Sequence, residues 1–290
     1  MTKLIIAPEK IEDIQNLAAQ IDAVLVGIEG YSVNYSEISF NDLEELVKLK
    51  EDGKEIFISL NKNMHNNELP KLREVLKKCS ELNVDGIFYA DVAVLQICND
   101  LNLSVPLVWA SEHMTTNLYT IKYWSEFNIK GAFLSPEITL EEIIEIKNGT
   151  NVPLIVQVFG YMPMYVSRRL AVSNYLKHFK LSTDSTKFSI INEGKNYPIV
   201  EKTGGTEIYS DTILNAIEEY LICKENGFEY CLLNGINIEI DKFERTIELF
   251  KSVTEKNKEE KRDEMDSMFK RTSQGFMHIE SIYRVKKNDK

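Results

Sequence analysis

The sequence lacks the short motifs that mark many hydrolases and metal enzymes. Neither an HExxH zinc signature nor a GxSxG nucleophile motif occurs in its 290 residues. Its histidines are far apart, at His65, His113, His178 and His278. Its cysteines form no CxxC pair and fall at apolar positions of predicted helices and one strand, at Cys79, Cys98, Cys223 and Cys231. This usage favours buried, reduced thiols and gives no protease signature.

Long apolar runs are also missing. No run approaches the roughly 20 residues that cross a bilayer. The apolar start Lys3–Ala7 ends at Pro8, too soon for a signal peptide, so we interpret it as a first β-strand and expect a cytoplasmic protein. Hydrophobic residues make up 43% and charged residues 27%, which predicts a packed globular core.

Acidic residues are plentiful but unevenly distributed. The net charge of −11 argues against broad adhesion to nucleic acid or anionic membrane. From Ile146 to Thr183, however, there is no Asp or Glu. This segment, which we call the cationic island, carries Lys147, Arg168, Arg169, Lys177 and Lys180. The island marks where an anion would bind.

Short β-branched runs alternate with helical patterns, which predicts βαβ units and a parallel sheet. The expected strands are Lys3 to Ala7, Ala23 to Ile28, Glu55 to Asn61, Gly86 to Ala90, Pro106 to Ala110, Gly131 to Ser135, Leu154 to Phe159 and Tyr230 to Asn234. Eight such strands close a TIM-barrel-like (β/α)8 fold. We therefore expect one barrel-type domain over residues 1–290, at a length that would also allow two small domains.

Helix signals support this alternation. Ser39 with Asp42, and Thr139 with Glu142, have the spacing of capping boxes. From Leu69 to Leu82, apolar residues recur at helical spacing, so one face packs on the sheet. The charged run 251–262 is interpreted as the solvated end of a helix.

The alternation breaks after the seventh strand. Within residues 161–211 we expect an inserted loop and a small antiparallel sheet over 188–191, 197–202 and 206–210, with turns at 192–196 and 203–205. An insertion at this end of a barrel is typical of a functional face. Residues 263–290 form an expected C-terminal extension, in which 272–280 and 281–286 could add an edge strand or cover the mouth.

Polar residues end the predicted strands and should share one mouth. They are Glu29, Asn61, Asp91, Ser111, Glu112, His113, Glu137, Gln157 and Asn234. Together with Arg168 and Arg169 they would bind a small polar or anionic ligand, because guanidinium groups bind carboxylate and phosphate bidentately. Asp91 and Glu137 are the candidate acid and base. Caps and loop contacts are the alternative role for any single residue.

The segment Gly160–Tyr175 resembles the signature of the collagenase-like peptidase family U32, which includes tRNA and ubiquinone hydroxylation proteins. The signature's glycine, two aliphatic positions and serine correspond to Gly160, Met162, Val172 and Ser173. Its two cysteine positions are Pro163 and Leu170, and a glycine position is Arg168. Shorter similarities occur at 7–8, 26–27, 61, 90–91, 116–117, 137–142 and 275–276.

The strand-end pattern, the cationic island and the resemblance together define an expected site. The candidate ligand-binding residues are Glu29, Asn61, His113, Asn117, Gln157, Arg168, Arg169, Ser173, Asn174 and Asn234. Hydroxylating members hold an iron–sulfur cluster through motif cysteines. Because Pro163 and Leu170 cannot ligate iron, we expect no such cluster and no metal in this chain.

Two functions follow from the resemblance. One is a role in forming 5-hydroxyuridine at the tRNA anticodon, a pathway that uses prephenate, with this chain as the cluster-free partner of a longer paralogue. The island would then contact tRNA phosphates, or its arginines would hold a small anion. The other is peptidase activity, for which no nucleophile, zinc triad or carboxylate dyad can be assigned. A binding subunit without catalysis is a third reading.

Overall fold

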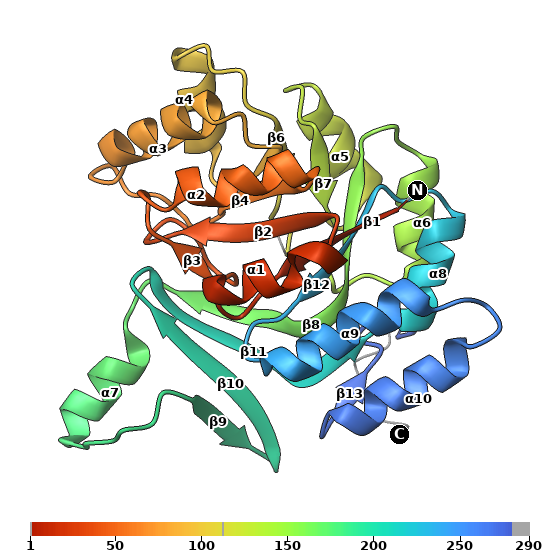
Figure 1. The fold of residues 1–290 in the computed structure, drawn as a ribbon. Helices are drawn as coiled ribbons and strands as arrows, with labels where there is room; N and C mark the ends of the chain where they lie inside the picture. The colour runs from red at the N-terminus through yellow and green to blue at the C-terminus, as the bar shows by residue number, and fades with distance from the viewer. Residues whose placement is uncertain (1, 112, 280–290) are drawn as a thin grey trace, which may run out of the picture.

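Eight parallel strands close into a barrel in the computed structural model, which describes residues 2–111 and 113–279 (Figure 1). The barrel strands are β1 (Lys3–Ala7), β2 (Ala23–Ile28), β4 (Glu55–Leu60), β5 (Gly86–Tyr89), β6 (Leu107–Trp109), β7 (Gly131–Phe133), β8 (Leu154–Ser167) and β12 (Tyr230–Asn234). Each pairs in parallel with the next, and β12 pairs with both β1 and β8, which closes the ring. The predicted TIM-barrel-like fold is confirmed.

Helices surround the barrel and connect its strands (Figure 1). The α-helices are α1 (Ile14–Leu17), α2 (Leu43–Val47), α3 (Leu69–Glu81), α4 (Val92–Asp100), α5 (Leu118–Ser125), α6 (Leu140–Asn148), α7 (Ala171–Phe179), α8 (Ile217–Glu225), α9 (Ile240–Ser252) and α10 (Lys258–Met268). Short 3-10 helices are η1 (Ile11–Asp13), η2 (Ala18–Gln20) and η3 (Lys48–Asp52). None of these helices is both long and apolar enough to cross a bilayer.

Of the two capping boxes and the charged run, one prediction is confirmed and two are wrong. Thr139 caps α6 in the predicted capping box, with the Glu142 amide and carboxylate completing it. The Ser39 prediction is wrong, because its hydroxyl donates to the Asp42 carboxylate at 2.7 Å instead of capping a backbone amide. The charged run 251–262 is also not one helix end: it spans the end of α9, a linker and the start of α10.

The predicted apolar face of α3 is buried against the barrel, and it contains Leu72, Val75, Leu76 and Cys79. A separate apolar cluster fills the barrel interior. It comprises Ile5, Ala7, Ala23, Leu25, Tyr35, Phe57, Phe88, Val108, Ala110, Phe133, Ile155 and Leu232. All but Tyr35 belong to the barrel strands or directly follow one, so the interior is packed and solid.

The inserted sheet extends one barrel strand outward. β8 continues beyond the barrel and pairs antiparallel with β11 (Gly205–Asn215). β10 (Lys195–Lys202) and β9 (Phe188–Asn192) follow, joined at Glu193 and Gly194. Both turn residues have positive φ, 50° and 74°, as a two-residue type I′ hairpin requires. The predicted insertion after the seventh strand is confirmed.

Two short strands lie at the margins of the sheet. β3 (Glu37–Ile38) pairs with β2, and β13 (Thr272–Ser273) pairs with β11. The C-terminal segment therefore adds an edge strand through β13. The second segment considered for this role, 281–286, lies outside the described residues.

The loop after β2 fills the barrel from its carboxyl end. Its Tyr35 side chain is 1% exposed and lies in the interior cluster. Ser32, also buried, comes so close to Gly27 that a Cβ on Gly27 would lie 2.3 Å from the Ser32 Cβ. We call residues 29–38 the mouth loop.

Replacing Tyr35 by alanine tests this packing. Tyr35→Ala is expected to lower the free energy of unfolding by about 3–5 kcal/mol, the usual cost of deleting a buried aromatic ring. Tyr119→Ala is the matched control, because Tyr119 is 80% exposed and its loss should cost no more than about 0.5 kcal/mol. Urea denaturation measures both. Equal stabilities would show that the mouth loop does not pack in the barrel.

Candidate functional site

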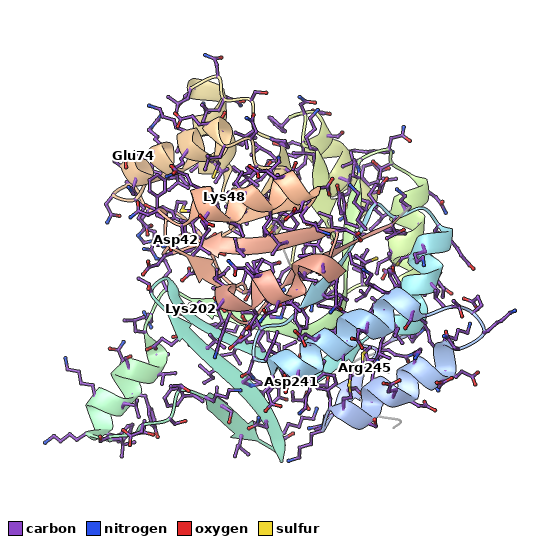
Figure 2. The ribbon with its side chains drawn as sticks, viewed as in Figure 1. Asp42, Lys48, Glu74, Lys202, Asp241 and Arg245 are labelled. Atoms are coloured by element: carbon purple, nitrogen blue, oxygen red, sulfur yellow. The ribbon has the colours of Figure 1, made fainter. Side chains whose placement is uncertain are left out.

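Two neighbouring segments, residues 61–62 and the end of β10, hold the mouth loop in place. The Val33 amide donates to the Asn61 Oδ1 at 2.9 Å. Two buried or half-buried lysines donate to loop carbonyls: Lys62 to Gly30, and Lys202 to Tyr35 at 2.6 Å. Figure 2 places Lys202 where the inserted sheet meets the barrel. The centre of the mouth is thus occupied by the chain itself, so a ligand at this end would contact the loops around it.

Asp91 organises two of these loops. One carboxylate oxygen accepts from the Ala93 amide at 2.9 Å and caps α4. The other accepts from the Met64 amide at 2.6 Å, which fixes the loop between β4 and α3. Both oxygens therefore hold backbone amides in this structure, and the predicted acid–base role of Asp91 stays a prediction.

Glu137, the other catalytic candidate, lies beside His113. The His113 Nδ1 and the Glu137 Oε1 are 3.6 Å apart, and the two side chains are 45% and 48% exposed. They follow adjacent strands, β6 and β7, so the barrel brings them together from distant parts of the sequence. Their neighbour Glu112 lies outside the described residues.

The other candidate residues around the mouth make contacts within the protein. Asn117 caps α5 through the Thr120 amide at 3.0 Å. The buried Gln157 donates to the Tyr161 carbonyl, and the exposed Glu29 accepts from Thr203 at 3.5 Å. The buried Asn234 accepts from the Ile236 amide and donates to the Asn34 carbonyl. These contacts shape the mouth, and ligand binding by these residues stays a prediction.

The glycine that opens the family-like segment has a steric role. Gly160 has φ +110°, and a Cβ on it would lie 2.1 Å from the backbone carbonyl oxygen of Asn234. A side chain here is excluded by both conformation and space. At this point β8 turns from pairing inside the barrel to pairing with β11.

Arg168 is tied to the rim of the mouth. Its Nη2 donates to the Glu68 Oε1 at 3.2 Å, and Lys62 donates to the same oxygen at 2.7 Å. Glu68 belongs to the loop that Asp91 fixes through Met64. The structure therefore joins Arg168 and Asp91 through one loop. Arg169 follows on the surface, and its backbone carbonyl accepts from Thr206.

Ser173 and Asn174 lie at the start of α7. The Glu201 carboxylate, from β10, accepts from the Ser173 hydroxyl and from the amides of Val172 and Ser173. It caps the helix that Leu170 cannot cap. Asn174 is exposed, and its amide donates to the Leu170 carbonyl. The helix is thus fastened to the inserted sheet through its first turn.

Sequence reasoning missed four charged residues that build this region: Lys62, Glu68, Glu201 and Lys202. Lys62 directly follows Asn61 at a strand end, so the same rule that selected Asn61 could have found it. The other three lie in loops or on β10, and no sequence pattern shows their partners.

A cavity of about 430 Å³ lies beside the mouth loop. Its lining includes Glu9, Glu29, Glu37, Lys202 and Thr203. Burial raises the pKa of the Glu9 and Glu37 carboxyls, against the lowering effects of backbone hydrogen bonds and Lys202. The lining holds four glutamates and two lysines, a balance of charge that disfavours a further anion.

The thiols do not fit an iron–sulfur cluster. The four cysteines are buried on α3, α4, α8 and β12, away from the motif positions Pro163 and Leu170 on β8 and at the start of α7. Burial raises the pKa of Cys79 to about 12 and that of Cys98 to about 11, and a hydrogen bond with Cys223 raises the pKa of Cys231. Cluster ligands are thiolates. Within residues 2–111 and 113–279, no group of three or more potential ligands could hold a metal ion.

Comparison with known proteins identifies the family of this chain and a solved structure with a similar fold. The model of peptidase family U32 matches residues 10–286. The chain belongs to peptidase family U32. The U32 peptidase Mk0906 has a similar fold, with a TM-score of 0.51 at 15% identity over 81% of this chain and 92% of that one.

Two relatives from Bacillus subtilis (strain 168) carry informative names. The chain is 28% identical to tRNA hydroxylation protein P2 over 81% of its own length and 79% of that protein. It is 25% identical to tRNA hydroxylation protein P1 over 53% of its length and 37% of that protein. This U32 chain therefore spans most of P2 but well under half of P1.

The Glu68 carboxylate accepts hydrogen bonds from both Lys62 and Arg168, so its pKa and its effect on stability can be tested. Burial alone would raise the pKa of its carboxyl, but hydrogen bonds from Lys62 and the His65 amide, with the Arg168 charge, lower it below the usual value. A lowered pKa in the folded state stabilises the protein above the unfolded-state pKa of about 4.3, and this stabilisation is lost as the pH falls through the lowered value.

Glu68→Gln is therefore expected to lower the free energy of unfolding by about 1–3 kcal/mol at neutral pH, because Lys62 loses a charged partner in a buried position. The difference from wild type should shrink below a pH of about 4. Glu74→Gln, which breaks an exposed pair with Lys71, is the control and should leave stability nearly unchanged. Urea titrations at several pH values measure these free energies of unfolding. A difference between Glu68→Gln and wild type that does not change with pH would contradict the charge argument.

Proposed function

We propose that this protein takes part in hydroxylating the wobble uridine of tRNA to 5-hydroxyuridine. The similarity to tRNA hydroxylation protein P2, which extends over 81% of this chain, supports the proposal most directly. The cationic island supports it as well, because Arg168 and Arg169 lie on the surface at the rim of the barrel mouth. Such a role belongs in the cytoplasm, where tRNA is found and thiols stay reduced.

The chain acts in this proposal as a cluster-free subunit beside a longer paralogue. In Bacillus subtilis the match of 245 residues is 79% of P2, whereas the match of 158 residues is 37% of P1, so P1 is the longer protein. The present chain has the proportions of P2. The longer partner would carry the iron–sulfur cluster that the thiols of this chain do not fit.

The arginines bind the anionic component of the reaction in this proposal. Two chemistries match them: tRNA phosphates, and a small carboxylate such as prephenate. Arg168 is already paired with Glu68, which holds its guanidinium at the rim. Arg169 is exposed next to it and is the better placed of the two for an incoming anion.

Charge reversal in cells tests the function. In a strain lacking this gene, wild-type protein should restore 5-hydroxyuridine in tRNA, measured by mass spectrometry of nucleosides. The Arg168→Glu, Arg169→Glu variant should fail to restore it, because a negative rim repels both candidate anions. Lys122→Glu with Lys130→Glu makes the same change in net charge on other exposed positions and should restore it.

Restoration by the arginine variant at wild-type level would contradict the role of the island. Normal 5-hydroxyuridine in the deletion strain itself would contradict the proposed function. Repeating the complementation with and without the longer paralogue separates a dependent subunit from a protein that acts alone. Thermal melting of each variant confirms that it is folded.

Iron analysis tests the cluster-free assignment. Protein purified without oxygen is expected to contain neither iron nor acid-labile sulfide in stoichiometric amount, because Pro163 and Leu170 replace the motif cysteines. The longer paralogue, prepared in parallel, is the positive control. Stoichiometric iron and sulfide in this chain would end the assignment.

A further inference from the structure

Helix α7 stands apart from the barrel, at the end of the inserted sheet (Figure 1). It has no buried residue, although its sequence contains several apolar side chains. The hydrogen bonds to Glu201 and Thr206 hold its first turn. We call residues 168–181 the α7 arm. Its remaining turns present most of their side chains to solvent.

The exposed side chains of the arm form a mixed aromatic and basic surface. Tyr175 and Phe179 are 58% and 56% exposed, and their ring centroids are 4.8 Å apart, as expected for side chains one helical turn apart. His178 makes an edge contact with Phe179. The arm itself carries four cations and no acid, namely Arg168, Arg169, Lys177 and Lys180. The carboxylates that contact it come from other segments: Glu201 at its first turn and Glu68 at Arg168.

This composition restricts what the arm can bind. Exposed rings favour a partner with flat apolar faces, whereas the cations require negative charge on the same partner. Unpaired RNA has both, since its bases stack on aromatic rings and its phosphates bind lysine and arginine. A duplex offers phosphates alone, because its base faces are already stacked.

We propose that the α7 arm binds unpaired nucleotides of RNA, with bases stacking on Tyr175 and Phe179 and phosphates contacting Lys177 and Lys180. The inference rests on the proposed function only for the kind of RNA, an anticodon loop, whose bases are unpaired. The net charge of −11 adds to the selectivity, because most of the remaining surface repels phosphates. The rings and lysines of α7 then form a binding surface beyond the rim at which Arg168 and Arg169 lie.

Binding of a fluorescent anticodon stem-loop to the purified full chain tests this inference. Tyr175→Ala with Phe179→Ala should weaken binding roughly tenfold to a hundredfold without changing its salt dependence, because stacking is lost and no charge changes. Lys177→Gln with Lys180→Gln should instead reduce the slope of log affinity against log salt by about 1.4, the value for two single-strand phosphate contacts.

Tyr119→Ala with Tyr123→Ala is the matched control, since these rings are also exposed but lie on α5. It should bind like wild type, as should Tyr175→Phe, which keeps the ring. A fully paired RNA of the same length should bind more weakly than the stem-loop and be insensitive to the Tyr175 and Phe179 change. Circular dichroism confirms folding of each variant.

Two results would overturn the inference. One is wild-type affinity of the Tyr175→Ala, Phe179→Ala variant for the stem-loop; if this variant also stops co-purifying with the co-expressed paralogue, the arm is a protein-docking element. The other is equal affinity of the wild-type protein for stem-loop and duplex. Ring-dependent RNA binding with normal 5-hydroxyuridine in the deletion strain would refute the proposed function alone.

Discussion

The close approach of β8 to the backbone of Asn234 is the constraint on which the rest of the structure depends. β8 pairs in parallel with β12 up to Phe159 and antiparallel with β11 from the same residue onward. Only glycine fits at position 160, where a Cβ would meet the Asn234 carbonyl oxygen. One strand can therefore serve both the closed barrel and the inserted sheet. The positions of Arg168 and of the α7 arm follow from the point at which β8 leaves the barrel.

The mouth loop closes the centre of the barrel's carboxyl end. Tyr35 belongs to the interior cluster, and lysines from two neighbouring segments bind loop carbonyls. A ligand at this end of the barrel would therefore contact the loops after β4 to β7 and the extension of β8. His113, Glu137, Glu68 and Arg168 occupy this outer ring. A reaction at this site would depend on these loop side chains and on a ligand or partner that shields them from solvent.

The fold was largely predictable because its signals are local. β1, β2 and β12 begin and end at the predicted residues, since each is a short apolar run between polar turns. The turn at Glu193 and Gly194 was equally predictable from its residue types. The Ser39 prediction failed because two side chains satisfied each other, a choice that the capping pattern does not encode. Sequence also marked the aromatic and basic segment without showing that it forms a helix capped by Glu201.

The site was predictable as a location and not as a set of contacts. Strand-end reasoning brought Asn61, Asp91 and Glu137 to one end of the barrel, where the structure has them. It could not show that Asp91 holds the Met64 amide, or that Glu68 joins Lys62 to Arg168, because these pairs are long-range or lie inside an irregular loop. Such contacts are fixed by how loops pack, and a single sequence carries no signal for that packing.

Charge segregation explains why the arm and the barrel can have different tasks. The net charge of −11 and the absence of Asp and Glu from the arm make the charge distribution uneven, so an anionic macromolecule would be drawn to the arm rather than to the rest of the surface. The Arg168 contact with Glu68 links this arm to the loop that Asp91 fixes at the mouth. A bound RNA would thus neutralise the charges that flank the rim and place its phosphates beside Arg169. Because that contact shares Glu68 with the buried Lys62, neutralising Arg168 changes the balance of charge at the mouth as well. In the proposed complex, binding at the arm would therefore be coupled to the electrostatics of the barrel rim through the Glu68 carboxylate.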